Sequence, residues 1–129
     1  IEHLYGHAVV TVHTTQPILM AVPSANYILL STHLKDSLEP ELLQAALAHE
    51  QAHLDQHHST IRAAGALAMA VAPGFSASER MAQATRITTE LLADDAAASK
   101  FSKHTVAQAL RASFGTSPLI EERVARLES

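Results

Sequence analysis

The chain has 129 residues, enough for one domain with a single buried core. Its net charge of −4 and the lack of a basic run argue against a nucleic-acid-binding protein. It contains no cysteine, which excludes disulfides and thiolate metal sites, so any metal must be held by histidine and carboxylate. Apolar residues make up 47% of the chain and aromatic residues only 4%, a mixture that favours helices packed closely through small side chains.

The first part of the sequence, residues 1–33, predicts strands. "HAVVTVH" (7–13) alternates, with Ala8, Val10 and Val12 on one face. "PILMAV" (17–22) and "NYILLST" (26–32) follow, each preceded by a short polar or Pro-containing segment. This spacing predicts a small antiparallel sheet.

From residue 36 onward the pattern becomes helical. Pro40 suits the first turn of a helix, and Glu39 and Glu41 lie beside its positive end. We expect this helix to run over 36–58. Further helices are expected at 60–72, 76–100, 105–114 and 117–128. These patterns therefore predict that residues 1–129 form a single α+β domain, with a small antiparallel sheet followed by about five helices.

No stretch is long enough to cross a membrane. The longest apolar window, "AAGALAMAVAPGF" (63–75), has 13 residues, whereas a spanning helix needs roughly 18 to 20. No signal peptide is visible. The chain opens at Ile1 rather than methionine, so we expect it to be a fragment of a longer protein.

The segment "ALAHEQAHLDQHH" (46–58) contains the clearest candidates for metal-binding and catalytic side chains. On a helix, His49 and His53 project from the same face one turn apart, so both imidazoles can reach one zinc ion. Glu50 is rotated by about 100° from His49, where it can hold and deprotonate a metal-bound water. The pattern predicts a zinc site with a catalytic carboxylate, although a helical interaction domain with a chance motif is the alternative.

A zinc peptidase needs a third protein ligand and leaves the fourth position to water. His57 repeats the spacing of four, but it lies about 12 Å along the axis from His49, too far for one ion to bind both. We therefore expect His57 and His58 at the helix end, where they suit the last carbonyls.

"TELLADDAAA" (89–98) offers a better third ligand. Glu90 and Asp94 share one face of a second helix, so Glu90 can bind the metal while Asp94 accepts a hydrogen bond from a ligand histidine. The alternative is that both are solvated helix acids, as we expect for Asp95. Spacing alone does not decide between the two.

Together, "AALAHEQAHLDQHH" (45–58) and "ELLADDAAA" (90–98) resemble the BlaR/MecR-type membrane metallopeptidases. They are also similar to the related HtpX and CAAX prenyl protease group. These families are gluzincins, with His-Glu-x-x-His and a downstream Glu-x-x-Ala-Asp. The resemblance covers roughly residues 20–128 and implies a gluzincin-like metallopeptidase domain.

The resemblance also implies a role for each motif residue. His49, His53 and Glu90 correspond to the ligands of one zinc ion per chain. Glu50 corresponds to the general base, and Asp94 to the residue that orients a ligand histidine.

The end of the chain matches the same group in part. The prenyl-protease and HtpX group has a His-Pro-Pro segment followed by Glu-Arg near the active site, where this chain has "SPLIEERVARL" (117–127). Arg123 falls on the family arginine and is expected at the catalytic site. Ser117 takes the place of the histidine, and His104, the only histidine in the C-terminal half, is the candidate to substitute for it spatially.

We therefore predict a zinc-dependent endopeptidase that hydrolyses peptide bonds with a metal-bound water and Glu50 as general base. The substrate is expected to be a peptide or protein lying extended against an edge strand, with "NYILLST" (26–32) as the candidate. The alternative is a non-catalytic zinc-binding sensor or regulatory domain of the same family, since the histidine is replaced at Ser117.

Relatives carry transmembrane helices that this chain lacks. The resemblance thus implies a soluble peptidase domain taken from a bacterial plasma-membrane protein. It would face the cytoplasm and reach the membrane only through segments outside this chain.

Overall fold

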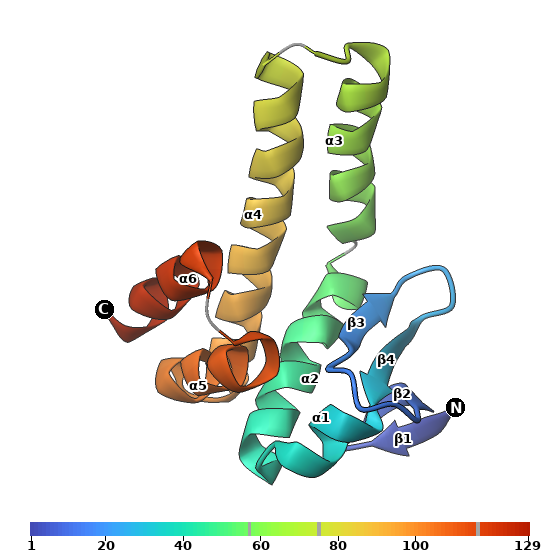
Figure 1. Ribbon diagram of the computed structural model, residues 1–129, viewed down its shortest axis with the longest axis vertical. Coiled ribbons are helices and arrows are strands. Elements are labelled where there is room, and N and C mark those ends of the chain that lie inside the picture. The colour runs from blue at the N-terminus through green and yellow to red at the C-terminus, as the bar shows by residue number, and fades with distance from the viewer. Residues whose placement is uncertain (57, 75, 116) are drawn as a thin grey trace.

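The computed structural model describes residues 1–56, 58–74, 76–115 and 117–129, with the backbone alone described at 58–61 (Figure 1). Over these residues a four-stranded sheet is followed by six helices, an α+β architecture as predicted. The strands are β1 (Glu2–Leu4), β2 (His7–Val12), β3 (Leu19–Val22) and β4 (Tyr27–Ser31). The helices are α1 (Thr32–Ser37), α2 (Pro40–Asp55), α3 (His58–Val71), α4 (Ser76–Lys100), α5 (Lys103–Phe114) and α6 (Pro118–Glu128).

The sheet is mixed, so the prediction of an antiparallel sheet is wrong for its central pair. The strand order is β1-β2-β4-β3, in which β1–β2 and β3–β4 are antiparallel and β2–β4 is parallel. Tyr5 and Gly6, with φ of 51° and 83°, form the two-residue turn between β1 and β2. The chain after β2 then crosses over so that β4 lies between β2 and β3. Sequence alternation assigns side chains to faces but does not specify strand neighbours, which is why the crossover was not predicted.

The strand predicted as the edge, 26–32, is in fact interior. β4 pairs with β2 on one side and with β3 on the other. Its Ile28 and Leu30 are fully buried. β3 is therefore the edge strand beside the helices, and α2 packs directly on it.

The buried face of the sheet is the one that carries Val9. Val9 lies opposite Ile28, Leu19 lies opposite Leu30, and all four side chains are buried. Val10, on the face that the alternation favoured, is only half-buried.

The helices pack closely through alanine, as the composition predicted. α2 packs on β3, β4, α4 and α5. α2 lies between the sheet and the helices α4 and α5 (Figure 1), and one face of it is buried along much of its length. The buried alanines among the described residues are Ala45, Ala46, Ala48 and Ala52 on α2, Ala82, Ala93 and Ala97 on α4, and Ala107 and Ala109 on α5.

The predicted helix over 36–58 is divided in the structure. α1 ends at Ser37, and Glu39 is extended because it precedes Pro40, which begins α2. α2 ends at Asp55, and α3 begins at His58. The expectation for His57 lies outside the described residues.

α3 and α4 form a long hairpin that extends away from the sheet (Figure 1). Over the described parts of the chain, no helix combines the length and the apolar character needed to cross a membrane.

Candidate metal centre

Three polar side chains of the His-Glu-x-x-His segment lie inside the protein. His49, Glu50 and His53 are only 4%, 6% and 6% exposed, because α2 is enclosed by the sheet, α4 and α5. Their potential ligand atoms all lie within 4.8 Å of one another. Buried polar groups of this kind need partners, and these partners come from other elements.

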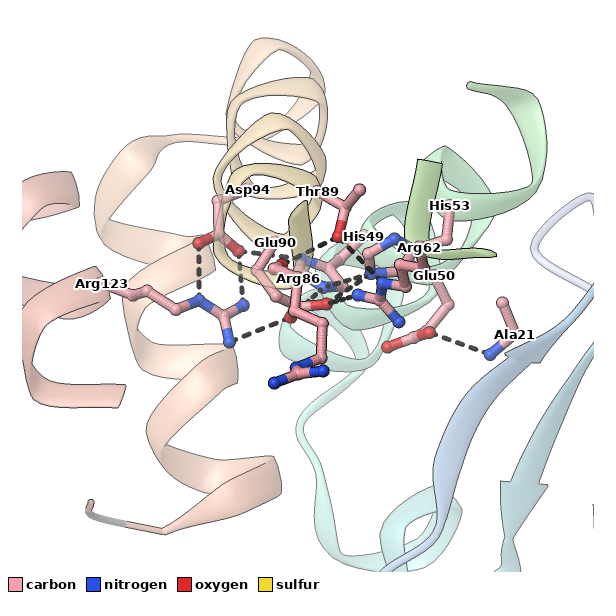
Figure 2. A network of polar contacts seen from close by, with 10 residues as sticks. All are labelled: Ala21, His49, Glu50, His53, Arg62, Arg86, Thr89, Glu90, Asp94 and Arg123. Carbon is pink, nitrogen blue, oxygen red and sulfur yellow. Dashed lines mark hydrogen bonds and ion pairs between the residues drawn. The ribbon is translucent and has the colours of Figure 1, made fainter. Parts of the chain in front are cut away.

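Glu90 approaches both histidines from α4. Its Oε1 lies 2.9 Å from Nε2 of His53, and its Oε2 lies 3.3 Å from Nε2 of His49. The two Nε2 atoms are 3.2 Å apart (Figure 2). In a tetrahedral site with bonds of about 2.0–2.1 Å, neighbouring ligand atoms lie roughly 3.4 Å apart. The three side chains therefore fit the nitrogen and oxygen ligands of one zinc ion.

Asp94 lies behind His49. It is fully buried, and its Oδ1 lies 2.8 Å from Nδ1 of His49. The two atoms are in close contact, but the angle at the ring N–H is poor for a hydrogen bond. Nε and Nη2 of Arg123 donate to both oxygens of Asp94 at 2.9 and 2.8 Å, and Nη1 lies 3.1 Å from Oε2 of Glu90. Arg123 thus holds both carboxylates of α4 from α6, as Figure 2 shows.

Glu50 faces the sheet rather than α4. Its Oε2 accepts a hydrogen bond of 2.9 Å from the backbone N–H of Ala21 on the edge strand β3. Glu50 and Glu90 both lie near the two histidines, and it is the carboxylate of Glu90 that contacts both Nε2 atoms. The two carboxylates therefore occupy different sides of the centre.

Sequence reasoning missed Arg62. Its Nη2 donates a very short hydrogen bond to Oε1 of Glu90, and its Nε donates to Oγ1 of Thr89 at 2.9 Å. The sequence feature that could have drawn attention to Arg62 is its place as the lone charged residue in the apolar run "IRAAGALAMAV" of α3. Nothing in the sequence indicated that α3 folds back against Glu90.

The enclosed charges shift one another's pKa values. Burial lowers the pKa of His49, but its contacts with Asp94 and Glu90 outweigh burial and raise the pKa to about 9. Burial raises the pKa of Glu50. Burial also disfavours charge on Glu90, yet the two histidines hold the pKa of this carboxyl well below its usual range. A metal needs neutral imidazoles, so binding here would displace a proton from His49.

Two cavities adjoin the centre. The β3 cleft, of about 300 Å³, is lined by residues that include Leu19, Ala21, Glu50, His53, Arg62 and Glu90. The arginine pocket, of about 550 Å³, is lined by residues that include Arg62, Arg86, Glu90, Leu119, Glu122 and Arg123. Arg62 and Glu90 line both cavities, so the two meet at the metal centre.

Residues 9–95, more than half of the chain, match the family model of peptidase family M48. The chain belongs to peptidase family M48. Comparisons with curated proteins and with solved structures gave no match. M48 membership confirms the metallopeptidase family that the motifs predicted, and the match includes His49, Glu50 and His53 of α2 and Glu90 and Asp94 of α4. A closer relation to the BlaR/MecR or HtpX type stays a prediction.

This M48 domain brings all the predicted site residues together, including Arg123 of α6, whereas Ser117 and His104 lie outside the cluster. Ser117, in the place of the family histidine, caps α6 by accepting a hydrogen bond of 3.2 Å from the N–H of Ile120. His104 is exposed, and its Nδ1 lies 3.3 Å from Glu128 rather than at the metal centre. Asp95 is exposed, as expected, and pairs with Arg126.

Proposed function

We propose that this M48 domain is a zinc-dependent endopeptidase in which His49, His53 and Glu90 hold one zinc ion. The convergence of two Nε2 atoms and one carboxylate within 2.9–3.3 Å of one another carries the proposal. The set contains one acidic and two imidazole ligands and leaves a fourth position open, which is typical of catalytic rather than structural zinc.

Zinc, when bound, supplies a Lewis acid that polarises the scissile carbonyl and makes water a better nucleophile. Glu50 is the general base. It takes a proton from the attacking water and returns it to the leaving amine. Burial raises the pKa of this carboxyl, which brings it closer to the range that proton transfer near neutral pH requires. The Ala21 N–H fixes one oxygen of Glu50, so the other is free to meet the water.

The substrate is a peptide or protein segment that lies extended along β3. β3 is an edge strand, and the β3 cleft runs beside it to Glu50, His53 and Glu90. An extended peptide pairs with such an edge through main-chain hydrogen bonds. β3 thus replaces the segment 26–32, which is interior, as the strand that receives substrate.

Arg123 and Asp94 position the centre rather than act on substrate. Every guanidinium nitrogen of Arg123 lies within 3.1 Å of Asp94 or Glu90. Asp94 in turn lies against Nδ1 of His49, and such outer partners fix ring orientation and raise ligand basicity.

The second candidate is a zinc-binding sensor or regulatory domain without catalysis. It is favoured by Ser117, whose hydroxyl caps α6 where the resembling families place a histidine. In either case we propose, from the same resemblance, that the domain functions in a membrane-attached bacterial protein.

Glu50→Gln and Glu90→Ala distinguish these roles. Glu50→Gln keeps the shape but removes the base, so we expect zinc to stay bound while cleavage falls about 10²–10⁴-fold. Glu90→Ala removes a ligand, so zinc content and cleavage should fall together. Zinc content is measured by elemental analysis and cleavage with an unfolded protein substrate. A domain that holds zinc yet cleaves nothing would favour the sensor, and loss of zinc from Glu50→Gln alone would reverse the assignment.

A further inference from the structure

The arginine pocket lies beside the candidate metal centre and is lined by residues of α3, α4 and α6. Its volume of about 550 Å³ is within the range of pockets that hold small ligands or substrate groups. Arg62 and Glu90 line both this pocket and the β3 cleft, so the two cavities adjoin at these residues. A peptide lying in the cleft can therefore place one side chain or its terminus in the pocket.

Two of the three guanidinium groups in the pocket have partners. Arg123 uses all three nitrogens on Asp94 and Glu90. Arg62 uses Nε on Thr89 and Nη2 on Glu90, while its Nη1 makes no hydrogen bond to the residues that the structure describes.

Arg86 is different. Its side chain is exposed, lines the pocket, and has no hydrogen bond or ion pair with any described residue. Figure 2 draws it extending from α4 on the side of Glu90 and Arg123. Glu122 lines the same pocket, yet no ion pair joins it to Arg86 within the described parts of the chain. An unpaired guanidinium with a planar fork of donors binds carboxylates through two parallel hydrogen bonds.

We propose that the arginine pocket is a substrate subsite for a carboxylate, which Arg86 holds with Nη1 of Arg62 beside it. This inference rests on the proposed function, because the peptide reaches the pocket from the β3 cleft. The carboxylate belongs either to an acidic side chain near the scissile bond or to a free C-terminus. Both present the same group to Arg86, so the experiment distinguishes them.

Peptide binding to zinc-loaded Glu50→Gln protein tests the subsite without cleavage. Fluorescein-labelled heptapeptide pools are compared by anisotropy, one with Glu and one with Gln at the fixed position, each as free acid and as C-terminal amide. A charge-assisted pair predicts roughly tenfold tighter binding of the pool that carries the carboxylate. A preference between Glu and Gln identifies a side chain, and a preference between acid and amide identifies the terminus.

Variants then assign the preference to the pocket. Arg86→Gln in the same background should reduce the affinity ratio to about one, while Glu122→Gln should increase it by removing a competing acid. Arg80→Gln is the matched control, since Arg80 is an exposed arginine of α4 that contacts Ser76 and is not part of the pocket lining. Equal binding of all pools, or a preference that survives Arg86→Gln, would overturn the proposal.

Failure of the subsite and failure of the peptidase give different results. If the wild-type domain cleaves peptides but shows no carboxylate preference, only the subsite is wrong. If it cleaves nothing while the Arg86-dependent preference is present, the subsite stands and the endopeptidase proposal fails.

Discussion

At the scale of single residues, the candidate metal centre contains buried charged side chains. Their burial is tolerated because they form ion pairs or hydrogen bonds with one another. Asp94 has no exposed surface, and Arg123 is 4% exposed, yet they form a bidentate ion pair. Removing one partner of such a pair typically costs about 3–5 kcal/mol, because the other charge stays buried and unpaired. Substitutions within this Asp94–Arg123 pair should therefore preserve side-chain shape.

Asp94→Asn is such a substitution. The amide keeps the volume but loses the charge beside Nδ1 of His49, so zinc affinity should fall by roughly 10–100-fold. Affinity is measured by competition with a chromophoric chelator, and circular dichroism checks that the protein stays folded. Asp95→Asn, on the exposed side of the same helix, should change zinc affinity little. Equal effects of the two would contradict a role for Asp94 at the metal.

Ala21→Pro tests the hydrogen bond that holds Glu50. Proline removes the donor N–H, and an edge strand tolerates it where that N–H points away from its neighbour. We expect zinc to remain and kcat to fall about tenfold, since a hydrogen bond to a charged group contributes about 1.5–3 kcal/mol. Ala21→Ser keeps the N–H and is the control. A raised KM with unchanged kcat would instead assign this N–H to substrate binding.

At the scale of elements, the α3–α4 hairpin holds Arg62 against Glu90. The two helices approach closely at Gly65, where an added Cβ would lie 2.6 Å from Oγ1 of Thr85 and 2.9 Å from Cα of Ala82. The second contact is with backbone, so the helices must move apart to accept any side chain. The position of Gly65 thereby helps to set where Arg62 meets α4.

Gly65→Ala should therefore destabilise the protein even though alanine favours helices. The propensity gain is about 1 kcal/mol, whereas overpacking typically costs about 1–3 kcal/mol. We expect a lower free energy of unfolding in urea and weaker zinc binding. Ala66→Gln, at the exposed neighbouring position, should leave both nearly unchanged. A stabilised Gly65→Ala protein would contradict the close approach of the helices.

At the scale of the whole molecule, the proposed metal centre brings together elements that are distant in the chain. α2 supplies His49 and His53, and α4 supplies Glu90. A metal that binds the folded chain and not the unfolded one adds its binding free energy to stability.

Zinc removal should accordingly lower the melting temperature. At a free zinc concentration of 100 times Kd, the stabilisation is about 2.7 kcal/mol, which corresponds to roughly 10 °C for a domain of this size. Differential scanning fluorimetry with and without a chelator measures the shift. His49→Ala should melt at the same temperature in both conditions. A chelator effect that persists in His49→Ala would place the stabilising metal elsewhere.

The sequence by itself determined what depends on local pattern. The helical pattern predicted α4 over its whole length, and the spacing of four placed His49 beside His53 and put Glu90 and Asp94 on one face. These relations hold inside one helix, where 3.6 residues per turn fix which side chains share a face. The family followed from the same two motifs.

Tertiary structure alone decided which elements meet. It set the parallel pairing of β2 with β4 and the position of β3 at the edge of the sheet. It also brought Ala21 to Glu50 and Arg62 to Glu90, and each of these hydrogen bonds joins segments that are distant in the chain. Periodicity specifies a face but not its partner, because that partner depends on how the whole chain buries its apolar surface. That packing fixed which strand lies at the edge of the sheet beside Glu50 and which arginines surround Glu90.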